Sequence, residues 1–232
     1  MSFVDKAIVS VARSAVKTRL RLNMRKDLPV VTMRNGDNRE VTLMGMRHIS
    51  PVTVFEAQAR LIETYPREDV FLEGIDMSEH EHYDRFKGLY PLIRDLTSTR
   101  RRPVGNQGDY VKESMGVIAD IDISAGDHRE VFNDIGNTMY NLTLMLEGLV
   151  NGDAHRFLNI DTSDLNIEEG FLVDARNRVL VDNVLASDSP RAIVPWGAGH
   201  LPGITSLLEE HGWNVVSRQV MTWRGNLVNA NG

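Results

Sequence analysis

Short apolar runs that alternate with amphipathic segments constrain the fold of this chain of 232 residues more than any other feature. Residues 28–34 and 40–44 have the composition of strands, and the Asn-Gly-Asp-Asn sequence at 35–38 is typical of a hairpin turn. Residues 52–64 have helical spacing, and a short apolar run follows at 69–72. A strand, a helix and another strand in this order favour a parallel crossover. We therefore expect an α/β fold with a mainly parallel sheet flanked by helices.

The middle of the chain is expected to be a helical insertion into this fold. Residues 129–150 and 166–186 have long helical spacing, whereas residues 192–195 have the composition of a strand that precedes a helix at 201–211. A chain of this length suits one hydrophobic core, so residues 27–232 are predicted to form a single domain.

The first 26 residues are predicted to form a basic amphipathic helix. They contain seven basic residues and one acidic residue. Apolar side chains recur there at helical spacing, namely Val4, Ala7, Ile8, Val11, Ala12, Ala15 and Val16. Such a helix either packs on its own domain or on a second subunit, or makes a peripheral contact with an anionic membrane surface or a partner.

Composition excludes several classes of function. A formal net charge of -6 argues against general nucleic-acid binding, which requires neutralisation of phosphates. The absence of cysteine excludes disulfides, thiolate nucleophiles and zinc–thiolate sites within this chain. No apolar run approaches the ~20 residues that span a bilayer, so we expect no transmembrane segment and a cytoplasmic location. An apolar helix stripe and exposed strand edges favour a homodimer.

Three segments place polar side chains where strands are expected to end. Gly45 and His48 follow the run at 40–44, Glu73 ends the run at 69–72, and Gly197-Ala198-Gly199-His200 opens the helix at 201–211. Ligands of open parallel sheets bind beyond the carboxyl ends of the strands. The glycines Gly45, Gly197 and Gly199 would allow positive φ and a close approach of the backbone to a ligand.

His48, Glu73 and His200 permit two kinds of chemistry. Two histidines and a carboxylate with open positions can hold a divalent metal ion. The same three groups can act without metal, with one histidine as general base and Glu73 orienting it or the water. Asp120 and Asp122 could add carboxylate ligands, or they could form the polar face of one strand. His80 and His82 are interpreted as part of a solvated helix face.

Four ordered motifs resemble those of the TraB/PrgY/TIKI superfamily, whose relatives include erythromycin-esterase-like and ChaN-like proteins. The motifs are GMRHIS at 45–50, VFLEG at 70–74, ARNRVLVDNVL at 175–185 and AIVPWGAGHLPGI at 192–204. The resemblance implies a hydrolase, most often described as a metal-dependent peptidase, acting on a peptide or a related amide or ester bond. It implies His48, Glu73 and His200 as ligands of a divalent ion of the Mn, Co or Zn class, and Arg176 and Asn177 as further active-centre residues.

Two other functions remain open. A ChaN-like protein would use the same cleft to hold haem or a metal without catalysis. Alternatively, the basic helix would dock the chain on a partner or membrane while the cleft has no activity.

Overall fold

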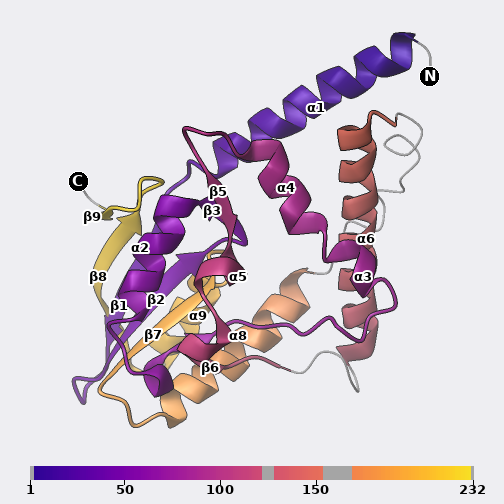
Figure 1. Ribbon diagram of the computed structural model, residues 1–232. Helices are drawn as coiled ribbons and strands as arrows, with labels where there is room; N and C mark the ends of the chain where they lie inside the picture. The colour runs from indigo at the N-terminus through magenta and orange to yellow at the C-terminus, as the bar shows by residue number, and fades with distance from the viewer. Residues whose placement is uncertain (1–2, 122–127, 154–168, 231–232) are drawn as a thin grey trace. The chain divides into compact units, whose positions relative to one another are not determined.

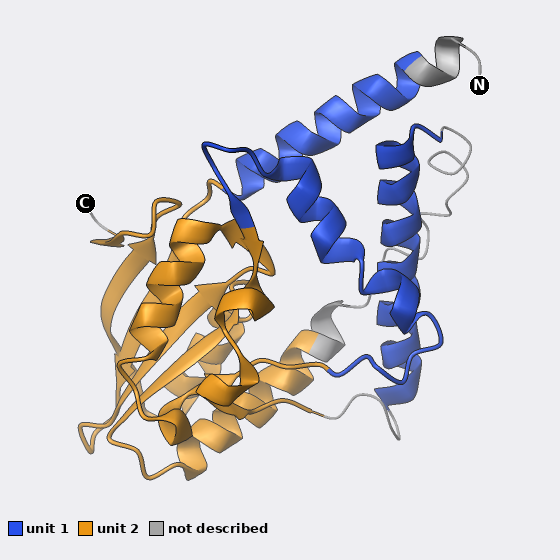
Figure 2. Cartoon of the chain, viewed as in Figure 1, with its two compact units in different colours: residues 1–24, 76–104, 122–169 blue, residues 25–75, 105–121, 170–232 orange. Residues whose placement is uncertain are grey.

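In the computed structural model, which describes residues 3–121, 128–153 and 169–230, the chain separates into two units (Figure 2). Unit 1 comprises residues 1–24, 76–104 and 122–169, and unit 2 comprises residues 25–75, 105–121 and 170–232. The single domain over 27–232 and the helical insertion stay predictions. The two units are defined by their internal contacts, and such contacts do not show whether either unit folds alone.

The central sheet of unit 2 has five strands in the order β7-β2-β1-β8-β9. They are β1 (Leu28–Arg34), β2 (Glu40–Met46), β7 (Arg191–Gly197), β8 (Asn214–Met221) and β9 (Leu227–Asn229). Only the β2–β7 pair is parallel, whereas β1–β2, β1–β8 and β8–β9 are antiparallel. The fold is α/β with a mixed sheet, and the expectation of a mainly parallel sheet is wrong. The reason is the hairpin, which turns β1 against β2 and leaves the other edge of β1 to the long-range partner β8.

The hairpin itself forms as its sequence predicts. The Val-Val-Thr run at 30–32 suits a strand because β-branched side chains fit a pleated surface. Asn38 has a φ of 62°, a conformation that asparagine tolerates better than most residues.

The parallel part of the fold extends beyond the central sheet. β4 (Phe71–Leu72) pairs in parallel with β6 (Val117–Ile118), and Val70 forms a parallel bridge to Ile193 of β7. β2, β7, β4 and β6 therefore run in the same direction, and their carboxyl ends face the same way. β7 lies between β2 and β4, which are the two strands of the expected crossover.

Helices cover both faces of the central sheet (Figure 1). On one face, α2 (Val52–Ile62) buries Phe55 and its neighbours among the inward side chains of β1 and β2. On the other face, α8 (Glu169–Ala186) and α9 (Leu201–Glu210) pack around the buried Trp196. Such a three-layer arrangement is the usual way for a sheet to bury two apolar faces.

Short elements complete unit 2. β3 (Ile49–Pro51) pairs with β5 (Val104–Asn106), and three short helical segments follow β-strands or link them. These segments are η1 (Arg67–Asp69), α5 (Gln107–Tyr110) and η2 (Glu113–Met115).

The described part of unit 1 is mainly helical. It contains α1 (Phe3–Asn23), α3 (Tyr83–Phe86), α4 (Leu89–Thr97) and α6 (Arg129–Asn151). Leucines of α4 and α6 form its core, against which Ala12 and Val16 of α1 pack. No helix among the residues that the structure describes is both long and apolar enough to cross a membrane.

His80 lies in this unit and differs from its expected place on a solvated face. Its ring is buried among Phe86 and Phe132, and its Nε2 lies 3.3 Å from the carbonyl oxygen of Asn133. The segment before α3 is not helical, so the helical spacing used to place His80 does not apply there.

Candidate active site

The carboxyl ends of four parallel strands carry the candidate site. Glu73 follows β4 directly, and Asp120 lies two residues after β6. His200 follows β7 and precedes α9, whereas His48 lies between β2 and β3. The fifth residue, Arg176, comes from α8, which packs under the same strands.

Arg176 and Asp120 form the most extensively bonded pair of this site. The Nε of Arg176 donates to Oδ1 and Oδ2 of Asp120 at 2.9 and 3.1 Å, and its Nη2 donates to Oδ2 at 2.6 Å. Only 1% of the Asp120 side chain and 5% of the Arg176 side chain are exposed. The backbone N–H groups of Gly74 and Ile121 also donate to this carboxylate. A forked guanidinium on a buried carboxylate fixes both side chains in one geometry.

Glu73 shares the guanidinium of Arg176. Its Oε1 accepts a bond of 2.8 Å from Nη2 of Arg176, and its Oε2 accepts one of 2.5 Å from the backbone N–H of Gly197. Glu73 thereby ties the end of β4 to the turn that precedes α9.

His200 has a defined tautomer. Its Nδ1 lies 2.8 Å from Oδ1 of Asn177, and its Nε2 lies 3.3 Å from Nη1 of Arg176. An arginine can only donate, so Nε2 must be the acceptor and Nδ1 must carry the proton. His200 is therefore a neutral Nδ1–H imidazole whose Nε2 lone pair is directed at a cation.

Trp196 forms the apolar wall of the site. Its ring contacts the edge of His200 with centroids 5.4 Å apart, and the guanidinium carbon of Arg176 lies 5.4 Å from its centroid. Its indole N–H donates to the carbonyl oxygen of Phe71 at 3.1 Å, which satisfies its one polar atom. The wall keeps water from one side of the charged groups, so their interactions are stronger than at an exposed surface.

His48 is the exposed member of the site. Its backbone carbonyl accepts a bond of 2.9 Å from the N–H of Gln107, so α5 begins beside it. The charges of Glu73 and Arg176 both act on its ring. Although the side chain is exposed, enough protein surrounds it to reduce its hydration.

The pKa values follow from burial and from these charges. Burial lowers the pKa of His48 and of His200 below the usual 6.5, with Glu73 opposing and Arg176 reinforcing the shift. Burial alone would raise the pKa of Glu73, but Arg176, the Gly197 N–H and His200 together lower it below 4.5. Burial also opposes the charge of Arg176, but the bonds from Asp120 and Glu73 raise its pKa. At pH 7 both histidines are neutral and Glu73 is ionised.

The three predicted ligand-approach glycines have different surroundings. Gly197 lies against Glu73 and His200, whose atoms would be 3.2 and 3.3 Å from an added Cβ. Gly199 faces open space. Gly45 lies within β2, with Pro29 at 3.0 Å from an added Cβ and Gln58 bonded to its carbonyl. None of the three has the expected positive φ.

The described residues do not fit the expected metal ion. Among them, no group of three or more His, Asp or Glu side chains is placed to hold one. The lone pairs of Glu73 Oε1 and His200 Nε2, which lie 3.6 Å apart, are both engaged by Arg176. The guanidinium thus takes the position that a cation would share between them. The metal site stays a prediction that this geometry does not support.

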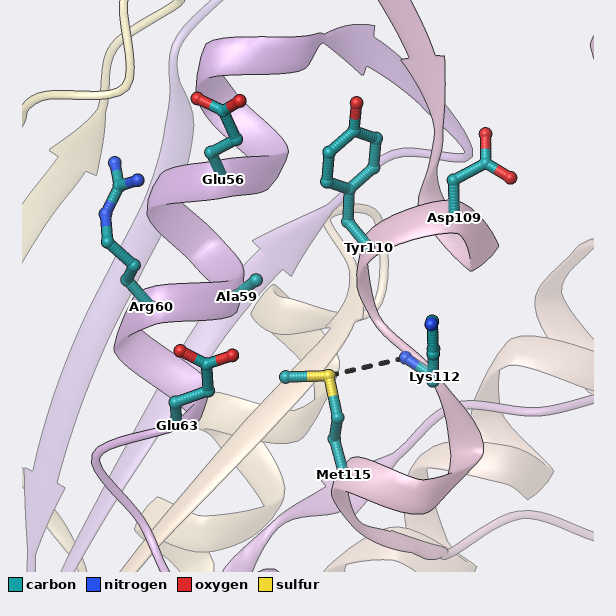
Figure 3. A pocket seen from close by; sticks show the side chains of 8 residues that line it. All are labelled: Glu56, Ala59, Arg60, Glu63, Asp109, Tyr110, Lys112 and Met115. Carbon is teal, nitrogen blue, oxygen red and sulfur yellow. Dashed lines mark hydrogen bonds between the residues drawn. The ribbon is translucent and has the colours of Figure 1, made fainter.

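A surface groove of about 450 Å³ lies elsewhere on unit 2, between α2 and the segment from α5 to η2 (Figure 3). Its lining is of mixed charge and includes neither histidine nor Glu73, with Arg60 and Glu63 on one wall and Lys112 on the other. It is therefore separate from the candidate site.

Asp120 is the site residue that sequence reasoning left undecided. Asp120 and Asp122 have the same local signal, an acidic residue after an apolar run. Only Asp120 can be placed, since residue 122 lies outside the described residues. Sequence reasoning also missed Trp196 of β7, because an aromatic residue in an apolar strand predicts only core packing.

No protein-family model, curated protein or solved structure matches this chain. The resemblance to the TraB/PrgY/TIKI superfamily therefore stays a prediction.

Proposed function

We propose that the protein is a hydrolase that cleaves a peptide or a related amide or ester bond at the His48–Glu73–His200 site. The observation that supports this proposal is the Arg176 network. It keeps one histidine buried and neutral beside a fixed cation and a carboxylate, while a second neutral histidine is exposed nearby. Perturbed groups of this kind at the ends of strands are typical of active sites.

In the proposed reaction His48 is the general base. It takes a proton from a water molecule as the water oxygen attacks the carbonyl carbon, and it returns this proton to the leaving group. Glu73 stabilises the imidazolium that forms, because its charge raises the pKa of His48. Arg176 places a fixed positive charge near the oxyanion that develops on the carbonyl oxygen.

His200 is a positioning residue in this proposal. Its Nε2 lone pair is directed at Arg176, so it is not open to accept a proton from water. Its role is to fix Arg176 and, through the bond from Nδ1, Asn177. The described geometry does not fit a metal ligand set, so no step is assigned to a metal.

The test is hydrolysis of a library of peptides and of simple esters by the full chain, with and without EDTA. We expect activity that persists in EDTA and falls by about 10²- to 10⁴-fold in His48→Ala and in Glu73→Gln. His211→Ala and Glu209→Gln, which change exposed residues outside the site, are the matched controls and should retain activity. Equal activity of the folded wild type and both site variants would refute the proposal, and complete loss in EDTA would restore the metal prediction.

A further inference from the structure

The exposed side of α1 carries a second apolar stripe, separate from the one that packs in unit 1. Val9 is buried, and Ala12 and Val16 pack against the core of α4 and α6. On the other side Ile8, Val11 and Leu22 are 41%, 71% and 56% exposed. The apolar side chains of α1 thus lie on two faces, of which one packs in unit 1 and the other is exposed.

This exposed stripe has the spacing of a coiled-coil seam. Its members alternate three and four residues apart, as a and d positions do, and they are Ile8, Val11, Ala15, Thr18 and Leu22. A stripe confined to a and d positions is narrower than the apolar face of a helix that covers a core.

The charges beside the stripe determine which helix would fit. Arg19 occupies an exposed e position, which faces the corresponding residue of a partner helix. Arg21, at a g position, is half-buried, and its Nε donates to the carbonyl oxygen of Thr97 at 3.2 Å. A second copy of α1 would bring more basic residues to these positions, because the first 26 residues contain seven basic and one acidic residue. Like charges across the seam disfavour that pairing, and glutamates there favour it.

A lipid surface suits the stripe less well. Helices that lie in a bilayer interface bury a broad face with Trp, Phe or Leu. Here the stripe contains Ala15 and Thr18, and no aromatic residue. The small side chains instead allow a helix to approach closely.

We propose that α1 is a docking site for an acidic amphipathic helix of a partner protein, which pairs with the stripe from Ile8 to Leu22 and places a glutamate beside Arg19. The inner face of α1 holds it on unit 1, so the stripe is presented in a fixed orientation.

The test uses two synthetic heptad peptides as probes. Their binding to the full chain is measured by fluorescence anisotropy. Both have alternating Leu and Ala at a and d, and they differ only in Glu or Lys at e and g. We expect the Glu peptide to bind at least about tenfold more tightly than the Lys peptide. Arg19→Glu should reduce or reverse this preference.

Two matched variants separate the stripe from general charge. Val11→Glu and Ser10→Glu each add one negative charge at an exposed position of α1, but only Val11 lies on the stripe. Val11→Glu should weaken binding of the Glu peptide by about tenfold or more, and Ser10→Glu by about threefold or less. Circular dichroism checks that both variants fold.

Three results would overturn the proposal. One is equal binding of the two peptides, or equal weakening by Val11→Glu and Ser10→Glu. Another is a homodimer in sedimentation equilibrium that Val11→Glu dissociates, which would make a second copy the occupant. The third is co-sedimentation with phosphatidylserine-containing vesicles that Val11→Glu abolishes while the Glu peptide fails to bind.

Discussion

The two Gly-x-x-His turns have the same spacing but opposite surroundings. Gly197-Ala198-Gly199-His200 leads directly into α9, and its histidine is buried against Arg176 and Asn177. Gly45-Met46-Arg47-His48 is followed by the strand β3 before α2 begins, and its histidine is exposed. Three residues, Ile49–Pro51, thus separate His48 from the helix that follows it, whereas His200 precedes its helix directly. A shared motif does not imply a shared role.

The largest expected effect comes from removing the carboxylate that anchors the buried network. Asp120→Ala leaves the guanidinium of Arg176 without its main partner and should lower the free energy of unfolding by about 3–5 kcal/mol. Urea denaturation measures this effect. Asp174→Ala, which removes an exposed carboxylate from the same helix as Arg176, is the control and should change stability by less than about 0.5 kcal/mol. Similar losses in both variants would mean that the network does not stabilise the fold.

Replacement of each of the two histidines should change the free energy of unfolding by a different amount. His200→Ala leaves its bonding partners Asn177 and Arg176 unsatisfied in a buried site and should cost about 2–3 kcal/mol. His48→Ala, at an exposed position, should stay within about 0.5 kcal/mol of the wild type. Equal destabilisation in urea titrations would contradict the assignment of different surroundings.

Much of this architecture could be predicted from local sequence. The strand predicted at 28–34 and the helix predicted at 129–150 match β1 and α6 within a residue, because alternation and helical spacing are local signals. The sheet order could not be predicted in this way. The partners β2 and β7 are about 150 residues apart in sequence, and nothing local shows that β7 lies between β2 and β4.

The site, like the fold, could be predicted only in part from the sequence. Glu73 and His200 could be expected near each other because both follow strands, and their atoms lie 3.6 Å apart. That Arg176 lies between them, bonded to Asp120, required the position of α8 in three dimensions. The different burial of the two histidines depends on the tertiary packing around β3 and α9.

The glycines around the second turn provide a smaller test. Gly203→Ala would place a Cβ 2.5 Å from Nδ2 of Asn177, so despite the better helix propensity of alanine we expect a loss of about 1–3 kcal/mol. Gly199→Ala adds a methyl group in open space and should change stability by less than about 0.5 kcal/mol. Equal thermal shifts for both variants would show that Asn177 does not pack tightly against α9.

The smallest effect is the pH dependence of stability. Since the folded state lowers the pKa of both histidines below 6.5, the unfolded chain binds more protons as the pH falls below that value. The free energy of unfolding should therefore decrease from pH 7 toward pH 5, and again below pH 4.5 as Glu73 accepts a proton. In urea titrations His200→Asn should reduce the first decrease. Stability that rises on acidification over this range would have the wrong sign.

The tautomer and charge of His200 can be measured by ¹⁵N NMR of the histidine rings in the uniformly labelled full chain, with His48→Asn and His200→Asn used for assignment. We expect His200 to be neutral at pH 7, with its proton on Nδ1, and to titrate below 6.5. An Nε2–H tautomer, or a charged ring at pH 7, would contradict the network of Arg176, Asn177 and His200 on which the division of roles between the two histidines rests.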